Sequence, residues 1–249
     1  MINELRSIIK TLHINKENAI AVPEGADWLD HDLEVSPEDF LEQAKRDYEL
    51  GGNSALLNSI TNAKRAIRCQ IDKVLFCVGY DPIPMKIRDK VKLLNSIGFA
   101  APRILRKVDN ARNLLEHQYK NPSLQEVEDS LDLALLFIEA LNRSVKPIGS
   151  DFSLVNEGNY VQEPFECYRN ELLFHFDTEK KCFKIWGEER FFRYPNAKYL
   201  TKKEIGSVIV RPYEMIFPDV LRIALNIEKG RERKTKDAVT TFLIKVEKT

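Results

Sequence analysis

The sequence predicts an α+β protein, in which an all-α bundle is followed by a small strand-rich domain. Through residues 36–146, apolar side chains recur every three or four positions, as they do on one face of a helix. The pattern changes at Pro147-Ile148-Gly149-Ser150, and short β-branched and aromatic runs follow. We therefore divide the 249 residues into an N-terminal extension with one short helix (1–35), a helical bundle (36–147) and a strand-rich domain (151–249).

The N-terminal extension carries one amphipathic pattern. The spacing of Leu5, Ile8, Ile9 and Leu12 predicts a short helix. The stretch Val22-Pro23-Glu24-Gly25 then breaks the regularity, and we expect the acidic run that follows it to form a solvated loop.

Start and stop signals delimit the helices of the bundle. Ser36 and Ser123 are capping residues, and Ser123 forms a capping-box pattern with Glu126. Glycines or the Asn121-Pro122 pair mark the ends of the segments. The predicted helices cover residues 36–50, 53–78, 85–97, 102–120 and 123–146.

The strand-rich domain begins with a predicted β-hairpin. Its arms are residues 172–176 and 182–186, joined by a polar turn. Further strands are expected at residues 191–194, 207–210 and 240–246, with a helix at 219–227.

The composition is that of a globular protein with a substantial core. Hydrophobic residues make up 43% and charged residues 31% of the chain. No apolar run approaches the ~18 residues of a membrane helix, and the N-terminus lacks the pattern of a signal peptide. We expect a cytoplasmic protein with no membrane partner. The four cysteines lack metal-site spacing, so we expect reduced structural thiols, no metal and no cofactor.

Charge is unevenly distributed although the net charge is zero. Residues 1–60 contain five basic and twelve acidic side chains, whereas residues 61–120 contain thirteen basic and five acidic ones. A basic segment of this kind attracts polyanions, and the alternative is that the two segments pack together and cancel.

Polar, chemically capable side chains crowd one predicted helix, at Ala111-Arg112-Asn113-Leu114-Leu115-Glu116-His117-Gln118-Tyr119. Residues four or seven apart share a helix face, so Asn113 lies with His117 and Arg112 lies with Tyr119. A guanidinium binds phosphate oxygens and an imidazole transfers protons near neutral pH, which together suit cleavage of a phosphodiester. RNA supplies its own 2′-hydroxyl nucleophile, so no metal is required. An ordinary polar helix face is the alternative.

This segment resembles the HEPN family (higher eukaryotes and prokaryotes nucleotide-binding), whose signature is an arginine and a histidine separated by four to six residues. Arg112 and His117 fit that signature, and Tyr119 extends the match to Arg-x4-His-x-Tyr, as in HEPN toxins paired with minimal nucleotidyltransferases. Asn62-Ala63-Lys64-Arg65-Ala66-Ile67 looks like the family's long second helix, and Asn121-Pro122-Ser123 looks like its exit into the last helix. The resemblance covers residues 36–146.

The resemblance implies a metal-independent endoribonuclease, active as a homodimer with its site at the interface, in toxin–antitoxin or antiviral defence. His117 would transfer protons, Arg112 would stabilise the phosphate and Asn113 would orient it. Tyr119 would be the residue that a partner nucleotidyltransferase modifies. The chain departs from the toxins in its additional ~100 residues after the bundle, which favour a recognition domain for substrate or partner.

Other basic residues are candidates for RNA binding. Lys64, Arg65 and Arg68 are predicted to lie on one helix beside the motif, or else to be paired surface charges. Lys234 belongs to the basic run 229–236, which is either a flexible RNA-binding loop or a solvated connection between a helix and a strand. We interpret His13, His31 and His175, and the aromatic residues Phe191, Phe192 and Tyr194, as structural.

Two alternative functions remain open at this point. In one, the bundle binds a nucleotide or RNA without cutting it, and the C-terminal domain recruits a partner. In the other, the chain is a structural helical adaptor that binds neither.

Overall fold

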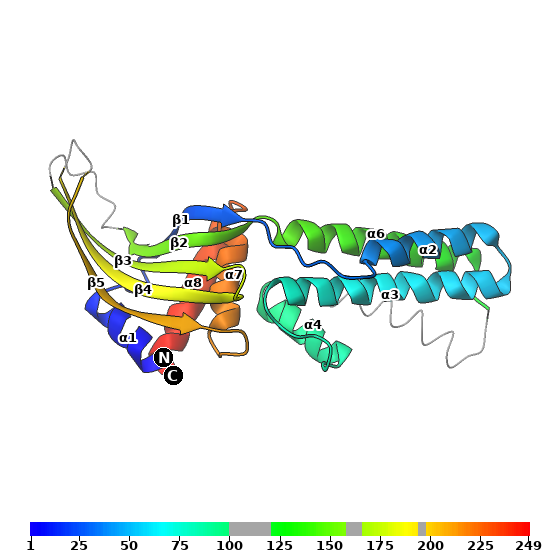
Figure 1. Cartoon of the computed structure of the whole chain (residues 1–249), viewed down its shortest axis with the longest axis horizontal. Helices are drawn as coiled ribbons and strands as arrows, with labels where there is room; N and C mark the ends of the chain where they lie inside the picture. The colour runs from blue at the N-terminus through cyan, green and yellow to red at the C-terminus, as the bar shows by residue number, and fades with distance from the viewer. Residues whose placement is uncertain (100–120, 158–165, 194–197) are drawn as a thin grey trace. The chain divides into compact units, whose positions relative to one another are not determined.

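The chain divides into two compact units in a computed structural model that describes residues 1–99, 121–157, 166–193 and 198–249 (Figure 1). A helical unit spans Asp30–Lys146, and a sheet unit combines Met1–Leu29 with Pro147–Thr249. The α+β class predicted from the sequence is therefore present. The helical unit is inserted between two segments of the sheet unit.

The helical unit is organised around one long helix. Its described helices are α2 (Pro37–Leu50), α3 (Asn53–Cys77), α4 (Ile87–Ser96) and α6 (Leu124–Val145). Helix α3 contacts each of the other three, and the apolar stripe predicted on it is buried. Four of the five predicted helices are thus confirmed, and the one at 102–120 lies outside the described residues.

Capping boxes begin α2 and α6, as the sequence predicts. The Ser36 hydroxyl accepts a hydrogen bond from the backbone N–H of Asp39 (3.1 Å), and the Asp39 carboxylate accepts one from the N–H of Ser36 (2.8 Å). Ser123 and Glu126 make the equivalent bonds at 3.3 and 2.7 Å. These bonds satisfy backbone donors that a helix start otherwise leaves unpaired.

The sheet unit is a five-stranded antiparallel sheet in the order β1-β2-β3-β4-β5. Its strands are β1 (Ala19–Asp27), β2 (Ile148–Asn156), β3 (Glu166–Asp177), β4 (Cys182–Arg193) and β5 (Lys198–Val210). Its helices are α1 (Ile2–Thr11), α7 (Phe217–Ile227) and α8 (Glu232–Lys248). The predicted hairpin is confirmed as the β3–β4 pair.

The three helices of this unit cover one face of the sheet. Phe183 contacts Phe217 of α7, and Phe174, which is opposite Ile185, contacts Phe242 of α8. At Gly187, two residues further along β4, a Cβ atom would lie 2.6 Å from Ile8 of α1. Because side chains alternate along a strand, these positions share a face. Glycine at 187 is what allows α1 to pack directly on the sheet.

Residues 1–29 do not form a separate extension, which corrects the predicted boundary at 35. Strand β1 pairs with β2, so the N-terminal segment completes the sheet begun at Ile148. Pro23 and Gly25 suggested an irregular stretch, and they do mark register shifts, but the strand continues through them. Its pairing partner lies more than a hundred residues away, so no local pattern indicates the pairing.

The predicted strand at 240–246 is wrong, because these residues belong to α8. Val239, Phe242 and Val246 are buried, at helical spacing, and Phe242 packs edge-on against Phe174 of the sheet. Packing against the sheet overrides the β preference of the local Thr-Thr-Phe sequence. The predicted strand at 191–194 is also not separate, since its described part, residues 191–193, forms the end of β4.

Candidate functional site

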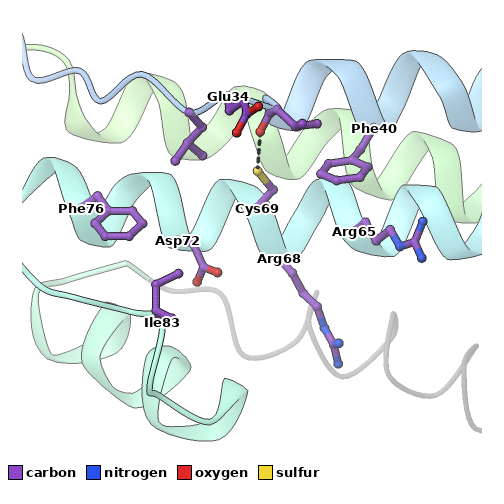
Figure 2. A pocket seen from close by; sticks show the side chains of 10 residues that line it. Glu34, Phe40, Arg65, Arg68, Cys69, Asp72, Phe76 and Ile83 are labelled. Carbon is purple, nitrogen blue, oxygen red and sulfur yellow. Dashed lines mark hydrogen bonds between the residues drawn. The ribbon is translucent and has the colours of Figure 1, made fainter.

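An open groove of about 410 Å³ runs along one face of α3 in the helical unit (Figure 2). Residues of α3 at helical spacing form one side of it, and α2 with two flanking segments forms the rest. The lining residues from α3 are Arg65, Arg68, Cys69, Asp72 and Phe76. The others are Leu33, Glu34, Val35, Phe40 and Ile83.

Apolar and aromatic side chains make up much of the groove wall. Phe40 and Phe76 are half-buried and lie toward opposite ends of the row of side chains in Figure 2. Val35 and Ile83 are 48% and 73% exposed, so apolar surface is open to solvent here. His31, one of the histidines we interpreted as structural, stacks on Phe76 at 4.6 Å between ring centroids. Such a wall suits a flat, partly apolar group.

Two arginines supply the groove's positive charge. The Arg65 guanidinium donates a hydrogen bond to Oδ1 of Asn62 (3.2 Å). Among the described residues, no carboxylate lies within ion-pair distance of Arg65 or Arg68. Both side chains extend away from the α3 backbone in Figure 2. Their donors are therefore available to an anion.

The carboxylate of Asp72 is hydrogen-bonded by a different cation, Lys90, although the charge of nearby Arg68 also acts to lower the pKa of Asp72. Lys90 Nζ of α4 lies 2.6 Å from Asp72 Oδ1 of α3, in a largely buried ion pair. Burial raises the pKa of Asp72, and the hydrogen bond from Lys90 opposes that rise. The pair thus ties α4 to α3 beneath the groove.

The Cys69 thiol is not a nucleophile in this setting. Its Sγ donates a hydrogen bond to the carbonyl oxygen of Val35 (3.4 Å). Burial, reinforced by the negative charge of Asp72, raises the pKa of Cys69 to about 11. The reactive thiolate is therefore scarce at neutral pH. Cys69, Cys77 and Cys182 form no disulfide within the described residues.

The residues that carry the catalytic prediction, Arg112, Asn113, His117 and Tyr119, lie outside the described residues.

The RNA-binding candidates separate into two places. Arg65 and Arg68 line the groove, whereas Lys64 does not contribute to its wall. Lys234 is exposed in the first turn of α8, in the sheet unit, so the run 229–236 is not the helix-to-strand connection that we considered.

The sequence did not predict one acid–base pair, which His175 forms with Asp151. His175 Nδ1 lies 2.7 Å from Oδ1 of Asp151, whose other oxygen accepts a hydrogen bond from the Ser150 hydroxyl (2.9 Å). We interpreted His175 as having no partner, and the pairing of β2 with β3 supplies one. Only recognition of β2 as a strand would have brought Asp151 opposite His175. The two side chains remain about half exposed.

A buried ion cluster on β3–β5 was also missed. Glu188 is 1% exposed and accepts hydrogen bonds from Trp186 Nε1 (2.7 Å), Arg190 Nε (2.6 Å) and Lys202, whose Nζ lies 2.8 Å away. Burial would raise the pKa of Glu188, but these hydrogen bonds outweigh it and hold the pKa below its usual value. Its cross-strand neighbour Glu171, fully buried, pairs with Arg190 at 2.8 Å.

Nothing in the described part of the chain points to a metal site. The described residues contain no group of three or more His, Cys, Asp or Glu side chains that could hold a metal ion. Of the helices in the described ranges, none has the combined length and apolar character needed to cross a bilayer.

No known protein family, curated protein or solved structure matches this chain.

Proposed function

We propose that this chain is a metal-independent endoribonuclease of the HEPN type, acting on RNA in toxin–antitoxin or antiviral defence. The observation that carries the proposal is the set Arg112, His117 and Tyr119 in Arg-x4-His-x-Tyr spacing. Two helices support it, since α3 contains the segment that looks like the family's long second helix and α6 begins directly after Ser123, at the segment that looks like the exit into the last helix. We propose that residues 36–146 correspond to the HEPN bundle.

In the proposed mechanism, His117 removes the proton from a ribose 2′-hydroxyl. The resulting oxygen attacks the adjacent phosphorus, and the bond to the 5′-oxygen of the next nucleotide breaks. The products are a 2′,3′-cyclic phosphate and a 5′-hydroxyl. Arg112 stabilises the charge that develops on the phosphoryl oxygens, and Asn113 orients the group. A homodimer would provide a second histidine to protonate the leaving oxygen.

The groove on α3 supports RNA as the substrate. Arg65 and Arg68 offer donors to phosphate oxygens, and the apolar wall with Phe40 and Phe76 suits an unstacked base. Lys64 and Lys234 remain candidates for weaker phosphate contacts. Tyr119 would be the point at which a partner nucleotidyltransferase silences the enzyme.

The direct test compares RNA and DNA of one sequence as substrates for the purified chain in EDTA. We expect the RNA to be cut and to carry 2′,3′-cyclic phosphate ends, because the 2′-hydroxyl is the nucleophile. The DNA, which lacks that hydroxyl, should remain intact. Cleavage of both, or cleavage that appears only after Mg²⁺ is added, would contradict the proposed mechanism.

A second candidate function is a non-cleaving module that binds a nucleotide or RNA, with a partner-recognition role for the sheet unit. The groove favours it, since Arg65, Arg68, Phe40 and Phe76 would bind such a ligand whether or not His117 acts. An intact RNA substrate that nevertheless binds, and whose binding falls when Arg65 and Arg68 are both changed to glutamine, would favour this function over cleavage.

A further inference from the structure

The start of α8 carries four cations that form no ion pair with any of the described residues. Arg231, Arg233, Lys234 and Lys236 are all exposed, and we call them the α8 basic patch. No carboxylate of the described chain lies within ion-pair distance of any of them. Glu232 and Asp237 are helical neighbours at the spacing that permits pairing with Lys236 and Arg233, yet neither pair forms.

Three other exposed lysines of the same unit are paired, whereas Lys10 and Lys248 make no ion pair with a described carboxylate. Lys16 lies 2.9 Å from Glu247, Lys180 lies 2.9 Å from Asp177, and Lys203 lies 3.4 Å from Glu189. The α8 basic patch differs from these positions in bringing together, within six residues, four cations that make no ion pair with a described carboxylate.

The patch also opposes the stability of its own helix. The N-terminus of a helix is the positive end of its dipole, and cations there are unfavourable. The N-cap residue is Arg231, and no side-chain hydrogen bond caps the first turn, in contrast to α2 and α6. The preceding Lys229 is affected as well, since burial and the charge of Arg231 lower its pKa to about 8. An anion bound at the patch would relieve this repulsion.

The fold fixes the helix backbone that carries these cations. Thr235, Val239 and Phe242 are buried and anchor α8, which keeps Arg233, Lys234 and Lys236 on the solvent side of its first turns. The Thr235 hydroxyl donates a hydrogen bond to the Arg231 carbonyl oxygen (3.1 Å). A cluster of exposed cations that make no ion pair with a described carboxylate matches a chain of several phosphates better than it matches a single carboxylate.

We propose that the α8 basic patch binds the phosphate backbone of single-stranded RNA and gives the sheet unit a role in holding the substrate. This inference rests on the proposed function only for the identity of the polyanion. The contacts are to phosphate, so binding should depend strongly on salt and little on sequence.

The test measures binding of a fluorescently labelled oligouridylate to the full chain by anisotropy, in EDTA, over a range of salt concentrations. All proteins carry His117→Ala so that the RNA stays intact. The patch variant combines Arg233→Gln, Lys234→Gln and Lys236→Gln. The matched control combines Lys16→Gln, Lys180→Gln and Lys203→Gln, which removes the same charge from the same unit.

We expect the patch variant to bind roughly tenfold more weakly than the control at moderate salt. The slope of log affinity against log salt should become shallower by about 2, because each phosphate contact on a single strand contributes about 0.7. The patch variant should melt at the same temperature as the parent protein or higher, because cations have left the positive end of α8. That melting result separates lost contacts from lost folding.

Two outcomes would overturn the inference. The RNA affinity of the patch variant could equal that of the control, whether or not both bind more weakly than the parent protein. The patch variant could also keep its RNA affinity but lose binding to phosphatidylcholine vesicles containing phosphatidylserine, which would assign the patch to an anionic membrane. Cleavage by the chain with His117 intact tests the proposed function separately, since it can persist when the patch is removed.

Discussion

The groove of the helical unit and the ion cluster of the sheet unit hold charge in different ways. At the groove, Arg65 and Arg68 make no ion pair with a carboxylate of the described residues. In the sheet unit Glu171 and Glu188 are buried, and cations of neighbouring strands hold them. Buried, fully partnered charges fix a structure, whereas exposed, unpaired cations are available to a ligand. We therefore expect ligands to bind at Arg65, Arg68 and the α8 basic patch, and not at the buried ion cluster around Glu188.

Among the substitutions that test this comparison, we expect the largest loss of stability at Glu188. Glu188→Ala leaves Arg190 and the Trp186 N–H without their buried acceptor, and we expect a loss of about 3 kcal/mol in the free energy of unfolding. Urea denaturation measures it. Glu189→Ala is the matched control, because its carboxylate is 39% exposed and pairs with exposed Lys203. We expect less than about 0.5 kcal/mol there, and equal losses would show that burial of the cluster is unimportant.

The helix caps should give the next largest effect. Ser123→Ala removes the side-chain acceptor of the capping box at α6, and we expect a loss of about 1 kcal/mol by urea denaturation. Ser130, on the same helix, only donates back to the Glu126 carbonyl oxygen. Ser130→Ala should therefore change stability by less than about 0.3 kcal/mol. A larger loss at Ser130 than at Ser123 would contradict the capping role.

The smallest effect concerns pH and Lys229. Its pKa falls to about 8 in the folded chain from 10.5, so between these values the unfolded chain binds the extra proton. Stability should therefore rise with pH across that window. After allowance for solvent screening of a partly exposed group, the gain is below about 1 kcal/mol. Melting of the wild type and of Lys229→Met from pH 7 to 10 measures it, and a rise of the same size in both proteins would remove Lys229 as its source.

The two units also differ in how far their sequences predict their structures. In the helical unit the signals are local: Ser36, Ser123 and the glycine stops lie within a few residues of the helix ends they define. In the sheet unit the decisive interactions are distant. Ala19 of β1 is paired with Asn156, and no pattern around Pro23 or Gly25 reveals that partner.

In the candidate site, too, contacts set by local sequence could be predicted and contacts set by distant residues could not. The helical periodicity of α3 places Arg65 and Arg68 on one face, so sequence alone brings them together. The apolar wall from Val35 and Ile83 comes from irregular segments whose path depends on tertiary packing. The contact between Asp151 and His175 depends on the register of two strands, one of which the sequence analysis did not recognise.

The most direct test of the account compares RNA cleavage in EDTA by the wild-type chain, by His117→Ala and by Lys203→Gln as a surface control. We predict that the control cuts RNA at the wild-type rate. His117→Ala should be slower by at least about 100-fold, because proton transfer is lost. Equal cleavage rates for His117→Ala and the wild type would contradict the assignment of His117, and with it the proposed function.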